Sequence, residues 1–85
     1  MRDDRENQRF ELGQGDDVVF AQYRRLGDTL YIDHVEAPPH RRGTGAAGEL
    51  MTAIVALADR ESLTLVPICG YAAAWLRRRP QMTKP

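Results

Sequence analysis

Two prolines and three closely spaced glycines divide this 85-residue chain into halves with different residue patterns. The prolines are Pro38 and Pro39, and the glycines are Gly43, Gly45 and Gly48. Because proline donates no hydrogen bond to a strand ladder, a strand that reaches Pro38 ends there. Glycines before a helix leave its free backbone N–H groups open to an anion. The run therefore predicts a strand end, a tight loop and a helix start.

The first half has the alternating apolar and polar pattern of β-strands. We predict strands over 9–12, 18–26 and 29–37. Gly13–Asp17 is a turn cluster between the first two, and Gly27-Asp28 is a two-residue hairpin turn between the last two. Residues 1–7 are polar and are expected to be flexible.

Strand faces are less clear than strand positions. In the second strand, one possible buried face holds Val18 and Phe20, and the rival face holds Val19, Ala21 and Tyr23. In the third strand, strict alternation divides the side chains into two sets. One set is Leu30, Ile32, His34 and Glu36, and the other is Tyr31, Asp33 and Val35.

The second half reads as helix, strand, helix. Apolar residues recur every three or four positions over 46–59, residues 63–66 form a short apolar strand, and a second helix is expected over 71–79. We expect the 63–66 strand to be central. A helix of at least about a dozen residues is what a parallel crossover needs. The predicted fold is α/β of order β-β-β-α-β-α, a mixed antiparallel and parallel sheet with two helices.

Composition limits the functional classes. The chain has 12 basic and 12 acidic residues, so it carries no net charge that would attract nucleic acid or a membrane surface. Its one cysteine excludes an intrachain disulfide and a cysteine-based zinc site, and we predict no metal. No signal peptide or membrane span is visible, so we expect a cytoplasmic protein. A single domain over 8–80, with a tail at 81–85, is expected to be a monomer or weak homodimer.

The three glycines match G-x-G-x-x-G, the dinucleotide-binding fingerprint, but their context argues against that function. The fingerprint follows a strand directly, whereas prolines and basic residues intervene here. The phosphate-binding loop of nucleotide hydrolases needs Lys-Ser/Thr where this chain has Glu49-Leu50. A plain helix-starting turn is a further alternative. The pyrophosphate of an acyl-CoA fits better, because it needs backbone donors and flanking arginines, here Arg41 and Arg42.

The same residues carry a family resemblance. Residues 32–47 resemble motif A of the GNAT (Gcn5-related) N-acetyltransferases. HVEAP…RGTG at 34–45 and PICGY at 67–71 are similar to the H-T-E-V-P…R-G-x-G and P-x-C-P-[FY] runs of a very small, single-domain GNAT-like family. The similarity extends over roughly residues 7 to 82.

The resemblance implies a minimal GNAT-like fold that binds acetyl-CoA. The pantetheine arm of acetyl-CoA would lie along the strand before the glycines, and the pyrophosphate would lie on the turn. The acetyl group would point into the gap between that strand and the 63–66 strand. The binding residues implied are Val35, Glu36, Ala37, Arg41, Arg42, Gly43, Thr44, Gly45, Ala46 and Cys69.

This chain departs from the family pattern in four places. His40 stands where motif A usually has glutamine or arginine, and Val35 replaces the threonine of H-T-E-V. Gly70 replaces the proline of C-P-[FY], and residues 79–82 replace a usual final H-P-E-Y. The part of the pattern that would bind phosphate is therefore better preserved in this chain than the part near the acceptor.

Four residues are candidates for catalysis. Cys69 precedes a predicted helix start, where free N–H groups and the helix dipole favour a thiolate that acts as nucleophile or on the CoA sulfur. Glu36 or His34 is a candidate base for the acceptor amine. Tyr71 is a candidate acid for the departing thiolate, as the family resemblance implies. Each also has a structural alternative: a buried small residue, a solvent-exposed strand charge, a hydrogen-bonded histidine and a packed ring, respectively.

The sequence therefore predicts an N-acetyltransferase-like protein that transfers acetyl from acetyl-CoA to an amine, with a protein or peptide amine as a possible acceptor. The alternative is a non-catalytic acyl-CoA-binding, regulatory or interaction module.

Overall fold

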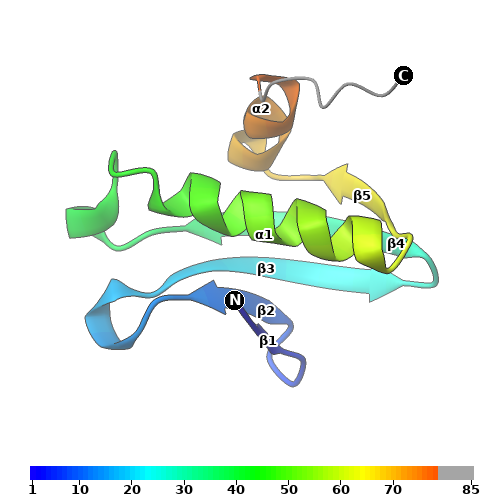
Figure 1. The fold of residues 1–85 in the computed structure, drawn as a ribbon, viewed down its shortest axis with the longest axis horizontal. Coiled ribbons are helices and arrows are strands. Elements are labelled where there is room, and N and C mark those ends of the chain that lie inside the picture. Colours follow the sequence, from blue (N-terminus) through cyan, green and yellow to red (C-terminus); the bar gives the residue numbers. More distant parts are fainter. Residues whose placement is uncertain (79–85) are drawn as a thin grey trace.

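A computed structural model describes residues 1–78 as a five-stranded mixed sheet with two α-helices (Figure 1). The strands are β1 (Arg2–Asp4), β2 (Arg9–Leu12), β3 (Val19–Leu26), β4 (Thr29–Glu36) and β5 (Thr64–Pro67). The helices are α1 (Ala46–Arg60) and α2 (Gly70–Arg78), and the short 3-10 turns are η1 (Gly15–Asp17) and η2 (Pro39–Arg41). The predicted α/β class is confirmed. The end of the second helix at Arg79, the domain end at Pro80, the residues compared with H-P-E-Y and the tail lie outside the described residues.

The strand order in the sheet is β1-β2-β3-β4-β5. The first four strands are antiparallel, and β5 adds to β4 in parallel after the α1 crossover. The prediction that the 63–66 strand is central was wrong, because among residues 1–78 β5 pairs with β4 alone and lies at the edge of the sheet. The sequence did not predict the strand at Arg2–Asp4, which pairs with β2. Alternation was hard to read there because all three residues of β1 are charged.

A β-bulge interrupts the pairing of β3 with β4. Gln22 pairs with His34 while Tyr23 pairs with Ile32, which leaves Asp33 without a partner. Such an extra residue reverses the facing of every side chain after it. The predicted face that joined Leu30 and Ile32 to His34 and Glu36 is therefore wrong. Val35 takes the inner side instead, opposite the buried Ala21.

One core lies between the sheet and the two helices. In β3 the rival face with Val19, Ala21 and Tyr23 is the buried one. Helix α1 contributes Leu50, Met51 and Ile54 at helical spacing, as predicted. The same cluster includes Ala72 of α2, so both helices cover the same face of the sheet. Among the described residues, no helix or strand covers the other face.

Tyr23 links the N-terminal strand to this core. Its ring stacks on Phe10, and its hydroxyl donates a 2.6 Å hydrogen bond to Asp3 Oδ1. Burial, and then the bond to the Asp3 carboxylate, raise the pKa of Tyr23 to about 12.

This shift predicts a loss of stability in alkali. Below about pH 10 both the folded and the unfolded chain keep the Tyr23 proton, whereas between about pH 10 and pH 12 only the folded chain does. The free energy of unfolding should therefore fall across that window, by an amount on the order of 2 kcal/mol. Guanidinium denaturation at several pH values measures it. Tyr23→Phe should flatten the fall and Tyr31→Phe should retain it; an equal fall in both variants would contradict the assignment.

Candidate functional site

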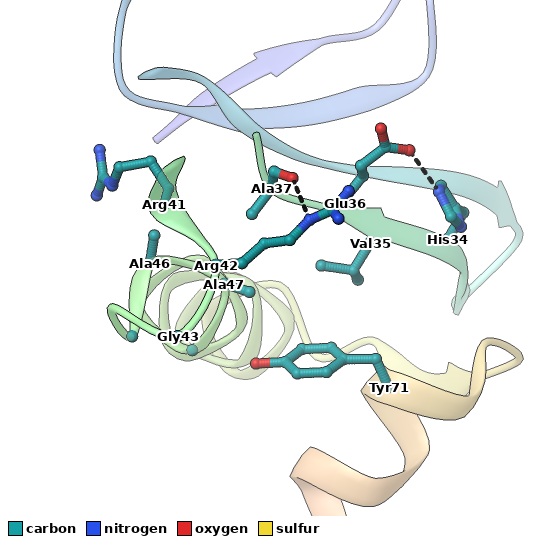
Figure 2. A pocket seen from close by; sticks show the side chains of 12 residues that line it. His34, Val35, Glu36, Ala37, Arg41, Arg42, Gly43, Ala46, Ala47 and Tyr71 are labelled. Atoms are coloured by element: carbon teal, nitrogen blue, oxygen red, sulfur yellow. Dashed lines mark hydrogen bonds and ion pairs between the residues drawn. The ribbon is translucent and has the colours of Figure 1, made fainter. Parts of the chain in front are cut away.

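A cavity of about 590 Å³ lies where β4 and β5 separate, bounded by the start of α1 and by α2 (Figure 2). The strand ladder ends at Ile32 and Pro67, so Asp33–Glu36 has no strand partner on its β5 side. The lining residues are His34, Val35, Glu36, Ala37, Arg41, Arg42, Gly43, Gly45, Ala46, Ala47, Gly48 and Tyr71. The unpaired edge of β4 and the glycine turn thus share one cavity.

The glycine turn presents free backbone donors to this cavity. Among residues 43–49, five backbone N–H groups donate to no acceptor in the described part of the chain. They belong to Gly43, Gly45, Ala46, Ala47 and Gly48. The first bond of the helix is donated by Glu49, to the carbonyl of Gly45. Converging free N–H groups at a helix N-terminus form an anion-binding site, and the helix dipole adds to the attraction.

Glycine is required at two positions of the turn. Gly43 has φ +80° and Gly45 has φ +90°, a region that residues with a side chain rarely adopt. A Cβ at either position would meet no protein atom within 4 Å. Within the protein, glycine is therefore needed at these positions for its backbone conformation and not to avoid a steric clash. The open space beside both glycines lets a ligand approach the backbone closely.

Two arginines flank the turn. The Arg42 Nε donates a 3.2 Å hydrogen bond to the carbonyl oxygen of Ala37, which holds the side chain against the end of β4. Figure 2 shows Arg42 running back across β4 and Arg41 extending outward from the turn. Both residues line the cavity, and a guanidinium group can donate paired hydrogen bonds to the oxygens of a phosphate. Thr44 does not line it, because its hydroxyl donates a 2.6 Å hydrogen bond to the Arg41 carbonyl and braces the turn.

His34 and Glu36 form a hydrogen-bonded pair at the cavity edge. The distance from His34 Nε2 to Glu36 Oε1 is 2.9 Å, and each side chain is half exposed. The bulge turns both onto the face of the sheet that no helix covers, with the ring of Phe20 beside His34. A base on this face can meet an acceptor that approaches from outside.

Tyr71 lies on the other side of the cavity. Its ring extends from α2 toward the start of α1 and faces Val35 across the cavity (Figure 2). Partial burial raises the pKa of Tyr71, while the positive charge of Arg78 opposes that shift. The hydroxyl is therefore protonated at neutral pH and can donate a proton.

Residues 9–84 match the model of the GCN5-related N-acetyl-transferase family. That span is nearly the whole chain. The chain belongs to this family. The mixed sheet with two helices is consistent with a minimal fold of the family.

Cys69 of this acetyltransferase-family chain is not among the lining residues. It is the residue before α2, where its Sγ accepts a 3.3 Å hydrogen bond from the Ala72 N–H. Its own N–H donates to the carbonyl of Ile32, the last residue of β4 that pairs with β5. The thiol therefore caps a helix at the point where the two strands separate.

Sequence reasoning missed two lining residues, Ala47 and Gly48. Gly48 was visible as the third glycine of the G-x-G-x-x-G match. It also has a packing role, because a Cβ there would lie 3.2 Å from Trp75 Nε1. Gly48 thus lets α2 approach α1 closely.

No helix among residues 1–78 is long and apolar enough to cross a membrane. No group of three or more histidine, cysteine or carboxylate side chains in this range is arranged to hold a metal ion.

Proposed function

We propose that this chain binds acetyl-CoA and transfers its acetyl group to an amine. The observation that carries the proposal is the set of five free N–H groups that follows two adjacent arginines, at a helix start that adjoins an unpaired strand edge. Backbone donors and guanidinium groups match a pyrophosphate, and no metal is required. Membership in the family supports the same chemistry.

Two sets of residues would hold the cofactor. The N–H groups of the turn, with Arg41 and Arg42, would hold the pyrophosphate. The free edge of β4 at Val35, continued by Ala37 just after the strand, offers backbone groups to the amides of pantetheine, as a further strand would. When bound, acetyl-CoA supplies an acetyl thioester.

The side chains around the gap divide the proton transfers between them. Glu36 would accept the proton of the acceptor amine, either directly or through His34, which is hydrogen-bonded to it. Tyr71 would donate a proton to the sulfur as CoA leaves. Cys69 would act either on the CoA sulfur or as a nucleophile that takes the acetyl group as CoA leaves.

The acceptor is proposed to be an amine of a protein or peptide. Small-molecule sites are concave and bury most of their ligand. His34 and Glu36 instead lie on the helix-free face, each half exposed. An acceptor there has to supply its own contact surface, which a macromolecule does.

Isothermal titration of the chain with acetyl-CoA tests binding, with CoA and adenosine as comparison ligands. We expect acetyl-CoA and CoA to bind and adenosine, which lacks the pyrophosphate, to bind far more weakly. Transfer is tested separately with lysine-containing peptides. Binding without transfer to any amine would support the alternative of an acyl-CoA-binding module, and the absence of acetyl-CoA binding would overturn both.

A further inference from the structure

The loop that joins β4 to α1 has few contacts with the rest of the fold. Residues 38–45 include no buried side chain. Their backbone hydrogen bonds are all local, within residues 38–49. The side-chain bonds of Arg42 and Thr44 are local as well. A loop of this kind is ordered only weakly by its own contacts.

Within the described residues, one hydrogen bond connects this loop to a distant part of the chain. His40 Nε2, in η2, is bonded to Asp17 Oδ1, in η1. The two loops lie at the same end of the sheet, at the left of Figure 1. Neither side chain lines the cavity. The bond therefore acts on the loop itself and leaves the cavity surface unchanged.

The Asp17 end of this contact is itself tightly built. Asp17 N–H donates a 2.9 Å hydrogen bond to the Gln14 carbonyl and closes the η1 turn. Gly13 has φ +104°, and a Cβ there would lie 2.6 Å from the Asp17 backbone oxygen. The turn thus depends on glycine at position 13 to bring Asp17 to its place.

Charge favours the contact at neutral pH. The hydrogen bond from His40, and then the positive charges of His40 and Arg41, lower the pKa of Asp17. The carboxylate is therefore ionised over the whole neutral range, and it accepts a hydrogen bond whether His40 is protonated or carries its single proton on Nε2.

We propose that the Asp17–His40 hydrogen bond holds the β4-to-α1 loop in the conformation that presents its free N–H groups together. Asp17 and His40 are then positioning residues for cofactor binding, an inference that rests on the proposed function. Ordering a loop during binding costs conformational entropy, and a contact that orders it beforehand reduces that cost.

Isothermal titration with acetyl-CoA tests the proposal on Asp17→Ala, His40→Ala and the double variant. Each single variant should bind about threefold to tenfold more weakly. The double variant should bind no more weakly than either single one, because the two residues make one contact. His40→Gln keeps a side-chain N–H donor and should recover most of the affinity. Asp16→Ala, which removes a neighbouring carboxylate, should bind as wild type does. Additive losses, or no loss, would overturn the proposal.

A second measurement does not depend on the cofactor. Backbone ¹⁵N order parameters of Gly43 and Gly45 should be about 0.85 in the wild type. They should fall toward about 0.6 in Asp17→Ala and His40→Ala. Values that are equal in wild type and variants would overturn the positioning role. If wild type binds no acetyl-CoA, the proposed function fails, while the order parameters still decide whether Asp17 and His40 order the loop.

Discussion

Replacing Gly45 with aspartate is expected to abolish acetyl-CoA binding. Gly45 has φ +90°, and its missing side chain would occupy the open space beside the free N–H groups. An aspartate there would put a carboxylate where the proposal places a pyrophosphate, and like charges at close range cost several kcal/mol. We expect at least about a 100-fold loss of affinity, measured by isothermal titration.

The chain offers a matched control for this substitution. Gly27 also has a positive φ and open space around it, but it lies in the β3–β4 turn and does not line the cavity at the glycine turn. Gly27→Asp adds the same charge with a similar backbone cost and should change the affinity by less than about twofold. Equal losses in the two variants would indicate a general effect of charge or stability and would count against the phosphate site.

Removing the proposed base is expected to have the largest effect on catalysis. Glu36→Gln keeps the size of the side chain and the backbone of β4 while it eliminates the carboxylate. Acetyl transfer to a lysine-containing peptide should slow by about 100-fold or more, while the dissociation constant for acetyl-CoA stays within about threefold. Single-turnover kinetics with titration on the same samples separate the two quantities.

Asp33→Asn is the appropriate comparison for the Glu36 variant. Asp33 is another carboxylate of β4, but it is bonded to Arg24 and does not line the cavity. Its replacement should leave transfer unchanged. His34→Gln tests the other candidate base: a larger loss there than in Glu36→Gln would assign proton removal to His34, with Glu36 orienting the ring. Unchanged transfer in all three variants would contradict both assignments.

Cys69 is where sequence and structure point in different directions. Its position before a helix suggested a reactive thiol, and the structure does put it at the start of α2. The thiol also accepts a hydrogen bond from the helix and stays outside the cavity lining. The acetyl transfer rate of Cys69→Ala should therefore be compared with its free energy of unfolding, because the loss of a helix cap alone costs on the order of 1 kcal/mol.

Local sequence signals predicted much of the fold. Alternation gave the positions of β2, β3 and β4, and helical spacing gave α1, because those patterns reflect which side chains must be buried. The same logic failed at the bulge, where one unpaired residue, Asp33, exchanges the two faces of β4. It also failed at β1, because its three charged residues show no alternation and it forms a strand by pairing with β2.

The sequence by itself determined that a glycine turn between two prolines and an apolar helix would expose backbone donors beside two arginines. This followed because proline stops strands and because glycine tolerates a positive φ, and both are properties of single residues. Only the tertiary structure decided that His34 and Glu36 lie on the open face, that β4 and β5 separate after Ile32, and that Asp17 reaches His40. Those features depend on pairing register and on contacts between residues distant in sequence, which no local pattern encodes.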